Sequence, residues 1–375
     1  MKMKIVADMN MPALEETFGL HGELLCLEGR SIEHADLLDA DVLLVRAVTR
    51  VNADLLQGTA VGFVGSATIG IDHLNTDWLE NHGIVWAHAP GCNADAAAQY
   101  TLAMMWLACQ RLNQEFRQQR VGIIGWGNVG RRLGQLLKTL DIPVMACDPP
   151  LADMGEPKLV SMAEVCANSI ISLHLPLTQT GRYPSKDLFD LERLTALQQG
   201  TLLVNAARGG VIEKQALFSA LRSGQIYAAL DVWPEEPYIK SELLDAVTVA
   251  TPHIAGYSRE GKQAGTEMIY RAFCSAFSLK TRGLPVTVSD LVIVDDPASA
   301  SPDQLLQRLL ESSCPVARDD AALRALPPMS GDQDHIQIDS LRNSYPDRRE
   351  FKSHRVTGTS GDQAHRLSNL GFKTG

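Results

Sequence analysis

The chain has 375 residues, which suggests two or three domains, and its content of 45% hydrophobic and 21% charged residues is typical of a globular protein. With 34 Lys and Arg against 44 Asp and Glu, the net charge of −10 argues against a nucleic-acid binder or a protein of acidic membrane surfaces, because both need a basic surface. The seven cysteines are scattered without CxxC spacing, so we expect reduced thiols, no metal site and no disulfide framework. We find no signal peptide and no apolar stretch long enough for a membrane span, which predicts a soluble, cytoplasmic protein.

Short runs rich in Val and Ile alternate with helical patterns along most of the chain. The predicted strands, in chain order, cover residues 4–7, 42–45, 61–64, 120–124, 143–147, 170–173, 202–204, 228–232 and 247–250. Strands that are apolar on both faces, with helix-length segments between them, indicate a parallel sheet covered by helices on both sides. The predicted fold class is therefore α/β.

A change of pattern near residues 91–98 predicts a domain boundary. An apolar helix over residues 99–112 follows the boundary, and a second α/β unit then runs to about residue 256. Residues 262–279 predict a helix that can return the chain to the first unit. Beyond residue 286, a strand over residues 288–295 and a helix that starts at Ser301-Pro302 predict a small α+β domain.

The segment VGIIGWGNVG, residues 121–130, lies between a predicted strand and a predicted helix. In this setting Gly125 makes the tight turn, Gly127 lets a pyrophosphate approach the backbone, and Gly130 lets the helix pack closely on the strand. Asp148 ends the next strand, where a carboxylate binds a ribose diol and repels a 2′-phosphate. The sequence therefore predicts a dinucleotide site that prefers NAD to NADP; the alternative is a glycine turn that binds nothing.

Three polar residues follow later strands: Arg208 in NAARGG, Glu236 in DVWPEEP and His253 in TPHIAG. Ligands bind beyond the carboxyl ends of strands in open α/β sheets, so we expect these side chains to converge beside the cofactor. A histidine can take the proton of a hydroxyl while the hydride leaves for nicotinamide, a carboxylate can orient the imidazole, and an arginine can bind a substrate carboxylate. Each residue alone has an ordinary structural alternative, but together they predict a hydroxy-acid oxidoreductase.

These segments resemble the D-2-hydroxyacid dehydrogenases. GSATIGIDH at 65–73, VRAVTRVN at 45–52, APGCN at 89–93, and RDDAALR and LRNSYPDRRE in the tail are similar to one branch of that family. Members of this branch oxidise 4-phospho-D-erythronate to 2-oxo-3-hydroxy-4-phosphobutanoate, an early step in pyridoxal 5′-phosphate (vitamin B6) biosynthesis. The resemblance covers nearly the whole chain, so it implies this activity, a small phosphorylated hydroxy-acid substrate, NAD as cofactor and no nucleic-acid or membrane partner.

The resemblance also implies a domain plan and a set of site residues. The implied plan has a flavodoxin-like substrate domain formed by residues 1–95 and 258–285. It also has a Rossmann-type, doubly wound NAD-binding domain over residues 96–257, and a C-terminal domain over residues 286–375 that makes a homodimer. His253 is the proton donor and acceptor, Glu236 its partner, and Arg208 the catalytic residue that binds substrate. The cofactor positions are Gly125, Gly127, Asn128, Val129, Gly130, Asp148, Leu175, Ala206, Asp231 and Gly256. The substrate positions are Ala47, Thr68 and Tyr257, and we add Arg46, in a loop after a strand, as the residue that binds the phosphate.

Two positions depart from the family pattern. Ala47 stands where the family usually has Ser, and Leu175 stands where it tends to have Thr. At each position a side-chain contact would be lost while a backbone contact would survive.

Two other functions stay open. One is another D-2-hydroxyacid dehydrogenase, of the phosphoglycerate or glyoxylate/hydroxypyruvate type, which shares the Arg, Glu and His. The other is a non-catalytic NADH-sensing regulator, which the lack of a long basic or disordered segment disfavours.

Overall fold

The computed structural model describes residues 2–375 apart from residues 237, 284–291, 296–300, 328–333 and 360. The chain divides into two compact units, Met1–Asn93 with Ser258–Ser289, and Ala94–Tyr257 with Asp290–Gly375. The C-terminal residues therefore group with the second unit, and their separation as a third domain stays a prediction. Within the described part of the chain, no helix is long and apolar enough to cross a membrane.

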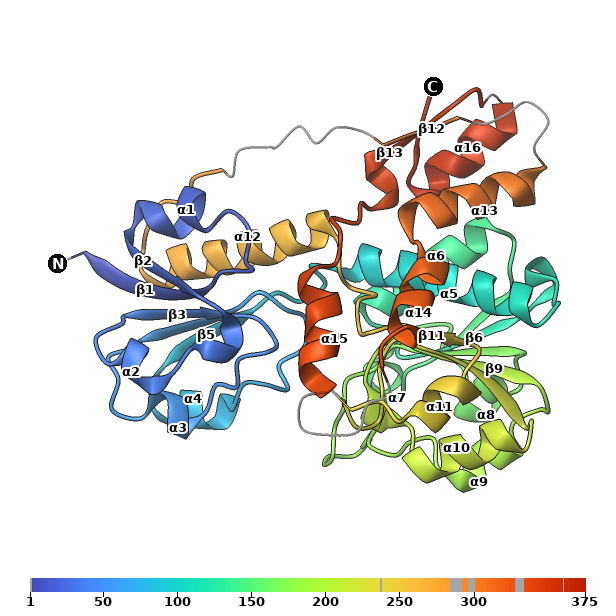
Figure 1. Ribbon diagram of the computed structural model, residues 1–375, viewed down its shortest axis with the longest axis horizontal. Helices are drawn as coiled ribbons and strands as arrows, with labels where there is room; N and C mark the ends of the chain where they lie inside the picture. The colour runs from blue at the N-terminus through green and yellow to red at the C-terminus, as the bar shows by residue number, and fades with distance from the viewer. Residues whose placement is uncertain (1, 237, 284–291, 296–300, 328–333, 360) are drawn as a thin grey trace. The chain divides into compact units, whose positions relative to one another are not determined.

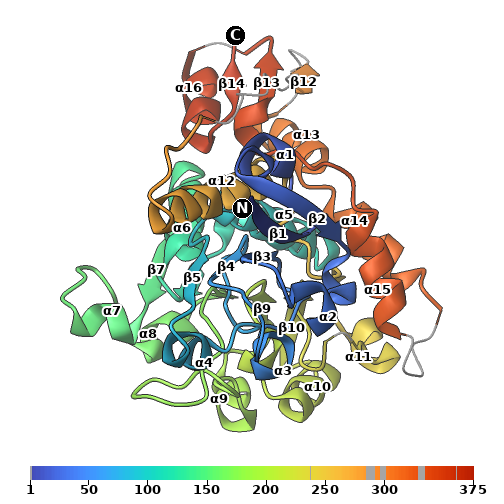
Figure 2. The same ribbon diagram turned by 90° about the vertical axis from the view of Figure 1, so that its left-hand side faces the viewer.

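The first unit holds a parallel sheet of five strands, of which β1, β2, β3 and β5 are labelled in Figure 1. Their order, β2-β1-β3-β4-β5, can be followed in Figure 2. Its strands are β1 (Met3–Asp8), β2 (Gly22–Leu27), β3 (Val42–Val45), β4 (Phe63–Ser66) and β5 (Val85–His88). Its helices are α1 (Leu14–Thr17), α2 (His34–Leu37), α3 (Ala53–Leu56), α4 (Thr76–Asn81) and α12 (Arg259–Ala276). This strand order is that of flavodoxin-like folds, as predicted.

Helix α12 returns the chain to the first unit, as the sequence predicted. It packs on β4 and β5, and Gly65 allows the close approach because a Cβ there would lie 2.3 Å from Cγ2 of Ile269. Phe273 of the helix contacts Phe18 and Phe63 edge to face, with ring centroids 5.3 and 5.9 Å apart. These buried rings are a large part of the apolar core that joins the helix to its sheet.

The second unit holds a parallel sheet of six strands in the order β11-β10-β9-β8-β6-β7. Its strands are β6 (Val121–Ile124), β7 (Val144–Cys147), β8 (Ile170–Leu173), β9 (Thr201–Asn205), β10 (Ile226–Leu230) and β11 (Val249–Ala250). Its helices are α5 (Ala94–Arg111), α6 (Asn128–Thr139), α7 (Pro149–Asp153), α8 (Met162–Cys166), α9 (Leu191–Ala196), α10 (Lys214–Arg222) and α11 (Ser241–Ala246). Since β7 and β8 lie on opposite sides of β6, the sheet has a switch point at β6, where ligands bind in doubly wound folds.

The described C-terminal residues of the second unit add a small parallel sheet and a group of helices (Figure 2). The strands, in the order β12-β13-β14, are β12 (Val292–Asp295), β13 (His354–Thr357) and β14 (Lys373–Thr374). The helices are α13 (Pro302–Ser313), α14 (Val316–Arg324), α15 (Asp334–Asn343) and α16 (Gly361–Leu370). Ser301 caps α13 and Pro302 is its first residue, as predicted. Residues 288–291 of the strand predicted here lie outside the described residues.

Helix α5 is the apolar helix that the sequence predicted, and it begins at Ala94. It packs against α6, against strands β9 to β11, and against α13 and α14 of the C-terminal part. Its middle turns, from Ala96 to Met105, are fully buried, which explains why this helix carries no charged residue between Asp95 and Arg111. The C-terminal part is thus joined to the Rossmann-type sheet through a shared apolar core.

Candidate active site

The glycine loop that follows β6 has the geometry of a dinucleotide-binding turn. Gly125 has a φ of +92°, and a Cβ on it would lie 2.2 Å from the carbonyl oxygen of His174. A Cβ on Gly130 would lie 2.0 Å from the carbonyl oxygen of Gly125. Gly127 differs from both, because apart from its chain neighbours no atom of the described residues lies within 4 Å of its Cβ position. Two glycines are therefore required by packing, and the third leaves space in front of helix α6.

The same loop fits the pyrophosphate of a dinucleotide. Gly127 is the N-cap of the twelve-residue helix α6, which starts with the predicted contacts Asn128 and Val129. The N–H groups and the dipole at this helix end favour an anion. Leu175 follows β8 on the other side of the switch point, next to the loop. In the described part of the chain, no group of three His, Cys, Asp or Glu side chains is placed to hold a metal ion.

Asp148 directly follows β7 and caps helix α7. Its Oδ1 accepts a hydrogen bond from the Leu151 amide at 3.1 Å, and its Oδ2 accepts one from the Trp126 amide at 2.8 Å. Asp148 therefore orients the glycine loop as well as its own helix. A carboxylate has about four acceptor positions, so these two bonds leave room for a ribose diol. That contact stays a prediction.

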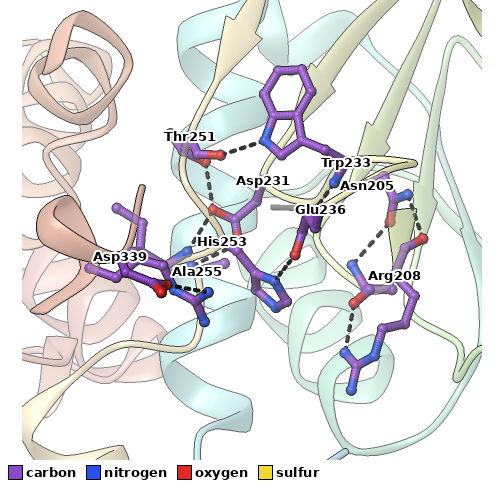
Figure 3. A network of polar contacts seen from close by, with 12 residues as sticks. Asn205, Arg208, Asp231, Trp233, Glu236, Thr251, His253, Ala255 and Asp339 are labelled. Carbon is purple, nitrogen blue, oxygen red and sulfur yellow. Dashed lines mark hydrogen bonds and ion pairs between the residues drawn. The ribbon is translucent and has the colours of Figure 1, made fainter. Parts of the chain in front are cut away.

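Arg208 lies in a turn that Asn205 holds together. The buried side chain of Asn205 donates to the Arg208 carbonyl oxygen at 3.0 Å and accepts from the Ala207 amide at 3.0 Å, with Ala206 inside the turn (Figure 3). A Cβ on Gly209 would lie 1.8 Å from the carbonyl oxygen of Trp233. The turn that carries Arg208 therefore rests directly on the loop that follows β10.

His253 and Glu236 are in direct contact, as expected from the sequence. Nδ1 of His253 lies 2.7 Å from Oε2 of Glu236, and Oε1 of Glu236 accepts a hydrogen bond from the Trp233 amide at 2.7 Å (Figure 3). The two side chains are 32% and 28% exposed, so a small ligand can reach them. Because Nδ1 is engaged with the carboxylate, Nε2 is the ring nitrogen that remains for a substrate.

The carboxyl group of Glu236 is held in its ionised form. Burial acts to raise the pKa of Glu236, but the charge of His253 and the hydrogen bond to it act in the opposite direction. The Trp233 amide and the positive charge of Arg342 lower the pKa further, so that it lies below its ordinary value. Glu236 therefore stays charged at pH values above the ordinary pKa of a glutamate.

His253 occupies an unusual backbone conformation that its neighbours stabilise. Its φ is +60°, in the left-handed region, which costs a residue with a side chain about 1–2 kcal/mol. The fully buried Asp231 accepts hydrogen bonds from the Thr251 hydroxyl at 2.6 Å and from the Ile254 and Ala255 amides at 2.9 Å. Asp231 therefore fixes the chain on both sides of His253 (Figure 3). Its predicted contact with the cofactor stays a prediction.

Gly256 and Tyr257 follow on the same loop and are partly buried. The hydroxyl oxygen of Tyr257 accepts a hydrogen bond from Nε of Arg342 at 3.3 Å, and the Arg342 guanidinium lies 5.8 Å from the centre of the tyrosine ring. Arg342 belongs to helix α15. The sequence did not single out this arginine, because a separation of 85 residues leaves no local signal for the contact.

The predicted substrate residues of the first unit follow β3 and β4. Arg46 comes directly after β3 and the exposed Ala47 follows it in a turn. Thr68 comes two residues after β4, and its hydroxyl donates to the Gly70 carbonyl oxygen at 2.9 Å. The Ser66 hydroxyl lies 2.8 Å from the Thr68 hydroxyl and 2.8 Å from Nε2 of His73. These residues are thus at the carboxyl ends of strands, and their role stays a prediction.

Comparison with known proteins assigns the chain to a family. Residues 90–255 match the model of the D-isomer specific 2-hydroxyacid dehydrogenase, NAD binding domain. The chain is 42% identical to the erythronate-4-phosphate dehydrogenase of Marinobacter nauticus, over 99% of both chains, and 42% identical to that of Cellvibrio japonicus, over 99% of this chain and all of the relative. The chain belongs to the erythronate-4-phosphate dehydrogenase family. Its fold is therefore that of the D-2-hydroxyacid dehydrogenases and its cofactor is NAD.

Solved structures agree with this family fold. The NAD-bound 3-phosphoglycerate dehydrogenase of Entamoeba histolytica superimposes with a TM-score of 0.65 at 22% identity, over 74% of this chain and 96% of the other. The D-lactate dehydrogenase of Aquifex aeolicus, a complex with NAD and lactic acid, does so with a TM-score of 0.62 at 21% identity, over 73% and 96%. Members of the erythronate-4-phosphate dehydrogenase family match this chain over almost its full length, and residues 288–371 match a domain of unknown function (DUF3410).

Proposed function

We propose that this protein oxidises 4-phospho-D-erythronate to 2-oxo-3-hydroxy-4-phosphobutanoate with NAD, within vitamin B6 biosynthesis. The chemistry is supported by one observation above all, the 2.7 Å contact between His253 and Glu236 at the carboxyl end of a Rossmann-type sheet. The choice of substrate is supported by full-length relatives named erythronate-4-phosphate dehydrogenase.

In the proposed mechanism the glycine loop and Asp148 would hold NAD, which would supply the hydride acceptor for the carbon that carries the substrate's hydroxyl group. Nε2 of His253 removes the proton of that hydroxyl, and Glu236 stabilises the imidazolium that results. Arg208 binds the substrate carboxylate through its planar guanidinium, whose N–H groups match the two carboxylate oxygens. Arg46, Ala47, Thr68 and Tyr257 complete the proposed substrate site, with Arg46 on the phosphate. Asn205, Asp231 and Trp233 hold the three reacting side chains in place.

We also propose that the enzyme works in the cytoplasm as a homodimer formed by its C-terminal residues. The similarity of residues 288–371 to a separate domain model supports a distinct task for this part of the chain. Its sheet also exposes an apolar side chain, Ile293 of β12, which is 65% exposed. Sedimentation of the full chain and of the Ile293→Asp variant tests this assembly, and a wild-type monomer at micromolar concentration contradicts it.

The test of the substrate compares turnover of 4-phospho-D-erythronate, 3-phospho-D-glycerate and D-lactate with NAD, with a 2-oxo acid present to reoxidise bound NADH. We expect kcat/KM for the four-carbon acid to exceed that for the three-carbon acids by at least about tenfold, the usual discrimination for one carbon. If 3-phospho-D-glycerate is the better substrate, the proposed mechanism still holds but the protein is a phosphoglycerate dehydrogenase. Tight NADH binding without turnover of any of the acids favours an NADH-sensing regulator.

Replacing Glu236 with Gln is expected to move the acid limb of the pH–rate profile to lower pH. Oxidation needs a neutral imidazole at His253, and the carboxylate stabilises the protonated ring. Because the pKa of Glu236 is lowered, the wild-type carboxyl group carries a negative charge beside the ring, and removing that charge favours the neutral ring. The measurement is kcat/KM from pH 5 to 9. An unchanged acid limb in the variant contradicts the proposed pairing.

A further inference from the structure

Two contacts from the C-terminal residues bracket the loop that carries His253. Before the histidine, Oδ1 of Asp320 accepts a hydrogen bond from the Ala250 amide at 2.7 Å, at the open edge of strand β11. After it, Arg348 donates from Nη2 to the Ala255 carbonyl oxygen at 2.5 Å and from Nε to the Tyr257 carbonyl oxygen at 2.8 Å. The loop is therefore tied at both ends to a part of the chain more than 60 residues away.

Arg348 sits in a site built for its guanidinium group. The residue is only 6% exposed, and its guanidinium lies 4.8 Å from the centre of the Tyr100 ring. Its Nη1 contacts the Ala96 carbonyl oxygen at 3.3 Å and Sγ of Cys314 at 3.2 Å. A buried cation is costly unless it is fully hydrogen-bonded, and here backbone carbonyl groups satisfy it. Its removal would leave these carbonyl groups without their donor.

The bracketed loop needs such support. His253 has a positive φ. Asp231 binds hydrogen-bond donors of this loop, which are the Thr251 hydroxyl and the amides of the two residues after His253. Arg348 binds carbonyl groups of the same loop. Asp231 therefore accepts hydrogen bonds from the donors of this loop, while Arg348 donates hydrogen bonds to its acceptors. A guanidinium can hold two carbonyl oxygens in a fixed geometry because its N–H groups form a rigid planar fork, whereas a lysine ammonium cannot.

We propose that Arg348 is a positioning residue for proton transfer, and that Arg348 and Asp320 together hold the His253 loop in its reactive conformation, in addition to any role of the C-terminal part in assembly. This inference rests on the proposed function. The NAD-binding domain that this chain shares with other dehydrogenases ends at residue 255, so it does not include Arg348. The solved dehydrogenases named above align with only about three quarters of this chain. Arg348 lies instead in the domain to which no function is assigned.

The test compares Arg348→Lys and Arg348→Met with Arg355→Met, an exposed arginine of the same C-terminal part that serves as the control. All are full-length chains whose folding is first checked by circular dichroism, and kcat, KM, NADH affinity and the pH–rate profile are then measured at 15 °C. We expect both Arg348 variants to lose at least about tenfold in kcat, since small displacements of a reacting group have effects of this size. NADH affinity should fall far less than kcat, since Gly125, Gly127 and Gly130 are untouched and Gly256 is the one predicted cofactor contact between the two carbonyl groups that Arg348 holds. The acid limb should shift as in Glu236→Gln, and the control should behave as wild type.

A readout independent of activity accompanies the kinetics. Amide hydrogen exchange of the peptide that covers residues 250–257 should be faster in both Arg348 variants, while exchange in β6 and α6 stays unchanged. Wild-type kcat in folded Arg348→Lys and Arg348→Met, or unchanged exchange in this peptide, overturns the inference, and so does an equal loss of NADH binding. If the wild type does not turn over 4-phospho-D-erythronate, the proposed function fails, and the exchange measurement alone decides the role of Arg348.

Discussion

Replacing His253 with alanine is expected to lower kcat by about 10²–10⁴-fold, the usual contribution of a general base. The variant should bind NADH as the wild type does, because the glycine loop and Asp148 are not touched. The change also removes the partner of Glu236, whose second oxygen remains bound to the Trp233 amide, so the loop after β10 should keep its place. The measurement is stopped-flow NADH formation with 4-phospho-D-erythronate, together with NADH binding by fluorescence.

The matched control for this prediction is His365→Ala, an exposed histidine in helix α16. It should leave both kcat and NADH binding at the wild-type values. Turnover of His253→Ala within about threefold of wild type would show that another group takes the proton, and the mechanism proposed above would then be wrong.

Gly209→Ala is expected to have the second largest effect. The new Cβ would lie 1.8 Å from the Trp233 carbonyl oxygen and 2.7 Å from the Pro234 nitrogen, so the backbone itself must move. We expect a loss of about 3 kcal/mol in the free energy of unfolding, at the upper end for overpacking, and a lower kcat in the folded fraction, because the Arg208 turn and the loop to Glu236 separate. Urea unfolding and kcat measured at low temperature test the two effects.

The neighbouring glycine provides the control for this substitution. A Cβ on Gly210 would meet only the Leu177 side chain, 3.2 Å from its Cδ2, and a leucine side chain can move. Gly210→Ala should therefore cost less than about 1 kcal/mol and keep its activity. Equal stability losses in the two variants would mean that the contact between the Arg208 turn and Trp233 is not the reason for the glycine.

Most of the sheet could be predicted from the sequence because its central strands are apolar on both faces. Strands β3 and β8 have the predicted bounds, and β4 and β10 are displaced by two residues. Strands β2 and β5 were not predicted. Both lie at the edges of the first sheet, where exposed and half-buried positions replace the continuous apolar run. The short β11 also begins two residues later than predicted, at Val249.

The site could be predicted where residues close in sequence carry it. The glycine loop and the contact of His253 with Glu236 follow from motifs after strands, and both are present in the structure. The residues that orient the site were missed for two reasons. Asn205 stands inside a predicted motif, but its role as a brace for the turn depends on backbone geometry. Arg348 contacts Tyr257 across 91 residues, and only the folded chain brings them together.

A single-turnover experiment with the full-length wild-type enzyme tests most directly whether the protein oxidises 4-phospho-D-erythronate with His253 as the base. Enzyme and NAD are mixed with 4-phospho-D-erythronate in the absence of any acceptor, NADH is followed by fluorescence, and the acid product is trapped as its hydrazone. We expect one equivalent of NADH and one of 2-oxo acid per active subunit in the wild type, and a far slower burst in His253→Ala. No NADH from the wild type, under conditions in which added NADH binds, would contradict it.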